Sequence, residues 1–216
     1  MNHIEFFGPP SLEEIAYLSG CSPETLVTIW TRQQEGAVEL LNTEGILVAR
    51  AEHTFPAGHS VGKRSAYEWM RSQMQKRIPS YDSSWPVWVS LTPLGNKEDL
   101  APGDRLICAR VPKKRLLMSF YNPWEHILQC MALIERSDGL WPAVWGMMPY
   151  LAMNSEGKDR LGRANNCISN IPECECRESW ERIFDLSLAC TAGFSGGNFL
   201  QATLSEIHIS DVVGIT

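Results

Sequence analysis

The side chains with the clearest capacity for chemistry are four cysteines in the C-terminal part of the chain. Cys167, Cys174, Cys176 and Cys190 are separated by six, one and thirteen residues. Four thiolates can hold a structural zinc ion, but such sites usually pair cysteines roughly two to four residues apart or combine them with histidine. No histidine lies near these cysteines in the sequence. The spacing therefore favours ordinary reduced thiols and leaves a metal site as an open alternative.

Acid–base chemistry has one local candidate, the adjacent Glu125 and His126. On a helix these neighbours point about a quarter-turn apart, so they are not a working pair without a third group. We interpret them as a helix start with an exposed histidine. His53 and His59 lie six residues apart in a segment rich in proline and glycine, and we interpret them as surface residues.

Phosphate-binding and nucleophile motifs are missing from the sequence, which has no Walker loop, dinucleotide fingerprint, nucleophile elbow or His-Glu-x-x-His pair. The glycine-rich run from Gly193 to Gly197 leads into a predicted strand. It therefore lacks the helix N-terminus that would hold a phosphate.

Eight tryptophans in 216 residues are many. Such side chains fill a core, or they line an aromatic cleft for a planar ligand. The candidates are Trp30, Trp69, Trp88, Trp141, Trp145 and Trp180.

The elements that must position these groups centre on a helix and a strand within residues 63–92. Apolar residues at spacings of three and four predict one stripe of a helix, made of Tyr67, Met70, Met74 and Ile78. Residues 86–92 alternate at period two, which predicts a strand with Val87, Val89 and Leu91 on one face and Trp88, Ser90 and Thr92 on the other. We expect the helix to dock on the strand through such faces, forming the start of an α+β core.

Further elements follow from the same signals. Asn122 is predicted to cap a helix, with Pro123 at its first position and Glu125 completing a capping box. The apolar phase of the last strand switches near Ser205 and Glu206, which predicts a bulge or kink there. We also expect strands at 27–32, 46–49, 106–111 and 116–118, helices at 34–42 and 179–186, and a loop at 52–64.

Residues 1–26 are predicted to form a helical appendage, with Ser11 and Glu14 as a capping box and Gly20 at the end of the helix. The segment is similar to the turn of a helix-turn-helix, whose second helix would cover residues 23–33. Residues 27–31 are β-branched and aromatic, however, which favours a strand.

Length and composition indicate a single domain over residues 27–216, with 44% apolar and 20% charged residues. The net charge of −6 argues against general nucleic-acid binding. No apolar run is long enough to span a membrane, and the N-terminus lacks signal-peptide features, so we expect a cytoplasmic protein with reduced thiols. The predicted fold class is α+β, with a mixed, mainly antiparallel sheet flanked by helices.

Several segments together resemble an uncharacterised bacterial family, a domain of unknown function. The resemblance spans about residues 28–216 and is most specific in the middle of the chain. It is carried by 30–33, 41–47, 66–78, 86–88, 179–185 and 201–203.

More distantly, the order of elements is similar to that of ADP-ribosyltransferases, which implies a split sheet and NAD as the substrate. The resemblance places Arg32 and Thr31 on the strand that holds NAD, with Arg32 at a phosphate or ribose. It implies that Tyr67 stacks on the nicotinamide and that Gln201 contacts the cofactor. Thr203 stands where such enzymes carry a glutamate, so Glu206 is the nearest acid that would stabilise the developing cation.

Three functions follow as hypotheses. The first is an ADP-ribosyltransferase-like protein that transfers ADP-ribose from NAD to a macromolecular acceptor. The second is a non-catalytic protein whose aromatic cleft binds a ligand or a protein partner. The third is a helix-turn-helix regulator. Whether the protein is an enzyme is left open, and no metal is assigned.

Overall fold

The computed structural model describes residues 2–54, 61–79, 81–93, 100–128, 130, 133, 173–190 and 200–216. Its main sheet has the strand order β6-β7-β4-β2-β5-β9, with β1 pairing beside β2, and β3 and β8 form a second small sheet. All these pairs are antiparallel except β1 with β2. The predicted α+β class with a mixed, mainly antiparallel sheet is confirmed.

The bounds of the elements are as follows. The strands are β1 His3–Ile4, β2 Leu26–Gln34, β3 Ile46–Val48, β4 Val87–Ser90, β5 Asp104–Pro112, β6 Leu117–Phe120, β7 Leu200–Leu204, β8 Glu206–His208 and β9 Val212–Ile215. The α-helices are α1 Leu12–Gly20, α2 Glu35–Glu44, α3 Ala51–Thr54, α4 Val61–Arg77, α5 Tyr121–Ile127 and α7 Glu173–Trp180. Short 3-10 turns cover Lys113–Arg115, Glu181–Phe184, Leu186–Cys190 and Ile209–Asp211.

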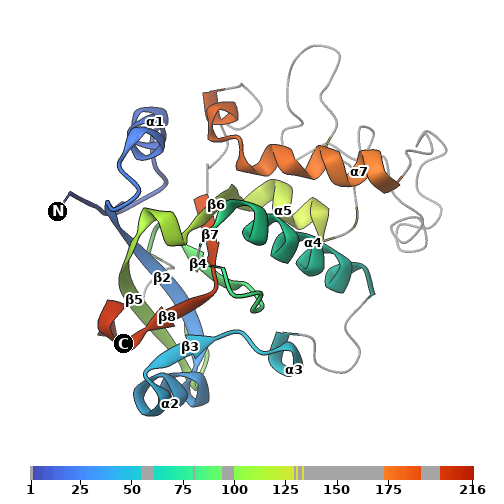
Figure 1. Cartoon of the computed structure of the whole chain (residues 1–216). Helices are drawn as coiled ribbons and strands as arrows, with labels where there is room; N and C mark the ends of the chain where they lie inside the picture. The colour runs from blue at the N-terminus through green and yellow to red at the C-terminus, as the bar shows by residue number, and fades with distance from the viewer. Residues whose placement is uncertain are drawn as a thin grey trace.

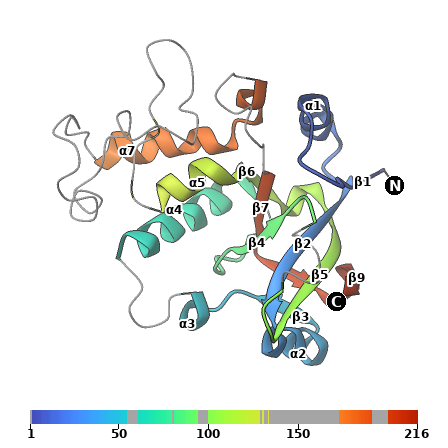
Figure 2. The same cartoon turned by 180° about the vertical axis from the view of Figure 1, so that it is seen from behind.

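Two hydrophobic cores lie on opposite faces of the main sheet. One contains buried side chains of α1, α2, β3 and β8, and the other contains those of α4, α5 and α7. Figures 1 and 2 show α4, α5 and α7 lying together on one side of the sheet, with α1 and α2 at opposite ends of it. The small sheet of β3 and β8 lies near α2.

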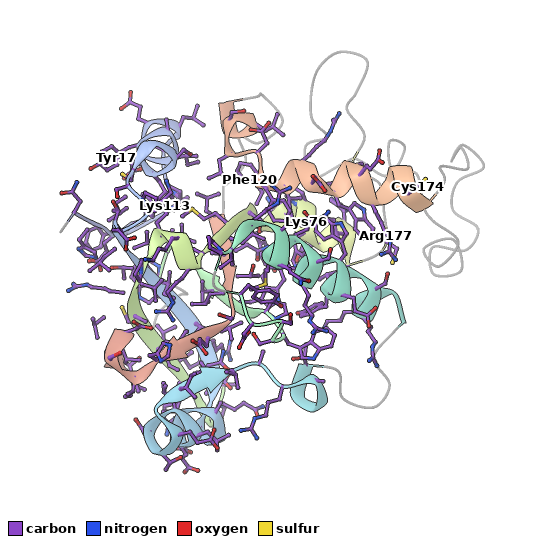
Figure 3. The ribbon with its side chains drawn as sticks, viewed as in Figure 1. Tyr17, Lys76, Lys113, Phe120, Cys174 and Arg177 are labelled. Carbon is purple, nitrogen blue, oxygen red and sulfur yellow. The ribbon has the colours of Figure 1, made fainter. Side chains whose placement is uncertain are left out.

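The central helix and strand form as predicted, as α4 and β4. Met70 and Met74 are fully buried, and Val87 and Val89 on β4 are buried, as is Leu91 directly after the strand. Helix α4 contacts the face of β4 that carries Trp88, which packs against the core containing α4. The opposite face of β4, with Val87 and Val89, belongs to the other core. Arg177 on α7 donates to Ser65 on α4 (3.0 Å), which ties the two helices together (Figure 3).

The N-terminal segment contains the predicted helix, and the Ser11–Glu14 capping box is confirmed. Ile15 and Leu18 of α1 are buried in the same core as the sheet, and β1 pairs with β2. The Nζ of Lys113 donates to the carbonyls of Ser19 (2.7 Å) and Cys21 (2.9 Å) at the end of α1 (Figure 3). These bonds satisfy carbonyl groups that the helix leaves unpaired.

Residues 26–34 form β2, as their β-branched composition predicted. A helix-turn-helix needs a second helix over these residues, so that motif is not formed.

Three predicted boundaries are wrong. The expected loop at 52–64 includes the end of α3 and the start of α4. Asn122 does not cap α5, because the helix begins at Tyr121, directly after β6, with no side-chain cap at Phe120. The helix expected at 179–186 is the last turn of α7, which begins at Glu173, followed by 3-10 turns.

The kink predicted near Ser205 is confirmed as a change of sheet. β7 pairs with β4 and β6, whereas β8 pairs with β3.

Some residues singled out from the sequence lie outside the described residues: the glycine-rich run at 193–197, Trp141, Trp145, Cys167 and His59. Within the described parts of the chain, the helices are too short or too polar to cross a membrane.

Candidate functional site

A cleft of about 1450 Å³ opens where β2 and β4 part from each other. The two strands share a single ladder pair, Trp30 with Ser90. Beyond it, β2 stays paired with β5 as far as Gln34, and β4 stays paired with β7 as far as Val87. The cleft is lined by the end of β2, one side of α2, β3 and the start of β4. It exceeds the roughly 300–1,000 Å³ of small-ligand pockets.

Thr31 holds the two diverging strands together. Its Oγ1 donates to the carbonyl of Trp88 (2.9 Å) and accepts a hydrogen bond from Nε2 of Gln33 (2.8 Å). The side chain lines the cleft, although Thr31 is almost fully buried. Its hydroxyl replaces a ladder bond that the divergence removes, so Thr31 shapes the cleft.

Arg32 lies at the cleft with an exposed guanidinium. Its Nε donates to Oδ2 of Asp104, and 44% of the side chain is exposed. The terminal nitrogens of Arg32 make no hydrogen bond to any described residue. Because a guanidinium presents five donors, these remaining groups can hold an anionic ligand.

One wall of the cleft is aromatic. Tyr67 of α4 and Trp88 of β4 line it, and Trp124 of α5 packs against both. The ring centroids of Tyr67 and Trp88 lie 5.8 Å apart and those of Trp88 and Trp124 lie 4.5 Å apart. Burial raises the pKa of the Tyr67 phenol, and the Trp88 side chain partly offsets this shift. The site therefore offers flat rings and a neutral hydroxyl.

The Tyr67 phenol is expected to ionise above its ordinary pKa of 10.0. Burial penalises the phenolate, so the folded state retains this proton more strongly than the unfolded chain does. The stability linked to the group is complete below about pH 10 and is lost as the pH rises further. Ultraviolet absorbance titration of the wild type minus Tyr67→Phe isolates the group. A difference curve with its midpoint at or below the ordinary value would contradict the prediction.

Gln201 also lines the cleft, from the neighbouring strand β7. It is 7% exposed, and its Nε2 donates to Oγ of Ser119 on β6 (3.4 Å). Thr203, two residues on, is fully buried between its ladder partners Trp88 and Leu117. A carboxylate at position 203 would therefore be sealed in the interior and not open to the cleft.

Glu206 does not line the cleft. Its carboxylate lies 2.8 Å from Nε2 of His208 on the small sheet. The His208 ring also accepts the backbone N–H of Asp211, which leaves Nε2 as the donor to Glu206. The change of sheet at Ser205 accounts for this placement.

Sequence reasoning identified Arg32 but missed the other ionic groups of the cleft, Glu44, Arg50 and Asp104. Among its described lining residues, the acids are Glu44 and Asp104, and each is paired with an arginine. Glu44 is 3.3 Å from Arg50, and both side chains are more than 40% exposed. Arg32 and Asp104 are 72 residues apart, so no local signal in the sequence could have shown their contact.

The other candidate groups do not gather into a site. His126 is partly buried, contrary to the expected exposure, and its two ring nitrogens make no hydrogen bond with described residues. Burial lowers its pKa, and the neighbouring Glu125 instead accepts a hydrogen bond from Tyr121 (2.9 Å). Cys174 is exposed on α7. Across the described residues, no cluster of three or more histidine, cysteine, aspartate or glutamate side chains is placed to hold a metal ion.

The comparisons with known proteins give one match. The model of a domain of unknown function, DUF3841, matches residues 28–138, just over half of the chain. Neither the curated proteins nor the solved structures give a match. The resemblance to an uncharacterised family is confirmed over residues 28–138, while its extension to residue 216, the bacterial origin and the more distant resemblance to ADP-ribosyltransferases stay predictions. The chain belongs to the DUF3841 family.

Proposed function

We propose that this protein is ADP-ribosyltransferase-like and binds NAD in the cleft between β2 and β4. One observation carries the proposal. Four residues assigned to NAD from the sequence, Thr31, Arg32, Tyr67 and Gln201, come from two strands and a helix, and all line the same cleft. Its volume of about 1450 Å³ leaves room for a ligand larger than those that most small-molecule pockets bind.

Each group has a stated task in this proposal. The terminal nitrogens of Arg32 hold the pyrophosphate of NAD through charge-assisted hydrogen bonds. The nicotinamide ring stacks on Tyr67. Transfer breaks the bond between the ribose C1′ and the nicotinamide nitrogen, nicotinamide leaves, and a nucleophile of a macromolecular acceptor bonds to C1′. The carboxylate assigned from the sequence to the positive charge at C1′ is Glu206, which would have to leave His208 and turn toward the cleft to act there.

A second candidate is a non-catalytic protein that uses the same aromatic cleft to bind a ligand or a protein partner. The placement of Glu206 favours it, because this carboxylate is bound to His208 outside the cleft. The two acids that do line the cleft are already paired with arginine, so neither is poised beside a sugar.

Calorimetric titration with NAD tests the shared first step. We expect saturable binding that Arg32→Ala weakens by roughly tenfold or more, since one charge-assisted bond contributes about 1.5–3 kcal/mol. Arg110→Ala is the matched control, because Arg110 is an exposed arginine of β5 that does not line the cleft. Absence of binding at millimolar NAD, or equal binding by both variants, would refute the proposal.

Release of nicotinamide separates the two candidates. A transferase releases it from NAD, at a rate that Glu206→Gln reduces, and labels an acceptor. If NAD binds but neither the wild type nor Glu206→Gln releases nicotinamide, the non-catalytic function is the correct one.

A further inference from the structure

Gln201 belongs to a polar row across three neighbouring strands. Its ladder partners are Ser90 on β4 and Ser119 on β6, so the three side chains lie on the same face of the sheet. This is the face that carries Trp88, whose ring contacts Tyr67. The row therefore runs beside the aromatic wall of the cleft.

The hydrogen bonds of the Gln201 amide leave one group without a partner among the described residues. Its Nε2 donates to Ser119, which is fully buried. Its Oε1 accepts no hydrogen bond from any described residue, and it is not among the atoms sealed in the interior. The Ser90 hydroxyl is already engaged with Thr92 (3.2 Å). A buried glutamine thus presents an unused acceptor to the cleft.

We propose that Gln201 recognises the carboxamide on the pyridine ring of NAD, whose N–H donates a hydrogen bond to Oε1 of Gln201. This contact selects NAD over its deamidated form. This inference rests on the proposed function. The deamidated dinucleotide carries a carboxylate at the same ring position, which has acceptors and no donor. Two acceptors would then face each other at a side chain that is almost fully buried, and neither would be satisfied.

The cationic groups of the cleft do not rescue the carboxylate. In the proposed complex the terminal nitrogens of Arg32 are occupied by the pyrophosphate, and Arg50 is bound to Glu44. Ser119 has the role of a positioning residue, because its hydroxyl holds the donor end of the amide away from the ligand. Without this contact the amide can turn and present either end to the cleft.

The test compares three ligands by calorimetry: NAD, nicotinic acid adenine dinucleotide and ADP-ribose. For the wild type we expect the deamidated dinucleotide to bind at least about tenfold more weakly than NAD. In Gln201→Met, which keeps length without the amide, we expect the two affinities to agree within about threefold. ADP-ribose lacks the pyridine ring, so Gln201→Met should bind it with the same affinity as the wild type. Ser119→Ala should narrow the preference for NAD, and it serves if Gln201→Met does not fold.

The outcomes separate this inference from the function on which it rests. Equal binding of both dinucleotides to the wild type would overturn the role proposed for Gln201. An undiminished preference for NAD in Gln201→Met would also overturn it. If that variant does not fold, an undiminished preference in Ser119→Ala would do so. The NAD-binding proposal would survive those results. If the wild type binds neither NAD nor ADP-ribose, both fail together.

Discussion

Replacement of Trp180 by alanine is expected to lower the free energy of unfolding by about 3–5 kcal/mol. Trp180 is 0% exposed at the end of α7 and is the largest fully buried side chain among the residues that the structure describes. Its ring meets that of Trp69 on α4 edge to face, with 5.3 Å between centroids. Removing it leaves a cavity between α7 and α4 and breaks an aromatic pair worth about 0.5–1.5 kcal/mol beyond its buried area.

Urea denaturation followed by tryptophan fluorescence and circular dichroism measures the loss. Tyr17→Ala is the control, because Tyr17 is 60% exposed on α1 and its loss should change stability by less than about 0.5 kcal/mol. Since Tyr67 lies on the same helix as Trp69, Trp180→Ala should also weaken ligand binding in the cleft. A loss of stability no larger than that of the control would show that α7 does not contribute to the core.

Thr203→Glu is expected to destabilise the fold by about 3–5 kcal/mol at neutral pH, and not to create a working carboxylate. Thr203 is 0% exposed in the middle of the sheet. A carboxyl group there loses its water and finds no cation, so its pKa rises above the ordinary value of about 4.3. The larger side chain also has to displace its neighbours.

Thr203→Val is the matched control. The Thr203 hydroxyl is buried and makes no hydrogen bond with described residues, so an apolar side chain of the same shape should leave stability unchanged or slightly higher.

The cost of Thr203→Glu relative to the wild type should depend on pH. When the pKa of a carboxyl group is higher in the folded state than in the unfolded state, its contribution to the free energy of unfolding is complete below the unfolded-state pKa. That contribution is lost as the pH rises through the folded-state pKa. The cost should therefore be smaller at pH 4 than at pH 7, as measured by urea denaturation at both. A cost that is independent of pH would show that the group is not desolvated.

Local features of the fold were readable from the sequence, because they depend on neighbours along the chain. The Ser11–Glu14 capping box forms as predicted. Gly45 ends α2 with φ of 77°, a conformation that glycine adopts without steric cost. The stripe of α4, the alternation of β4 and the kink at Ser205 also follow from residue types at short spacing.

Boundaries set by contacts between distant segments were not readable. Asn122 and Glu125 form an ordinary capping signal, yet α5 begins at Tyr121. Strand β6 pairs with β7 as far as Phe120 opposite Leu200, and the helix follows immediately. The strand pairing fixes the helix start, so the local signal has no effect.

The sequence by itself determined the fold class and named four residues that line the cleft, Thr31, Arg32, Tyr67 and Gln201, whereas only the tertiary structure decided that they lie around one cleft. Arg32, Tyr67 and Gln201 line one cleft because β2, β4 and β7 are neighbours and because β2 and β4 part after one ladder pair. Glu206 is five residues from Gln201 and is nevertheless bound to His208 on another sheet. A strand that changes sheets separates neighbours in the chain, and this depends on pairing with β3, which no local pattern encodes.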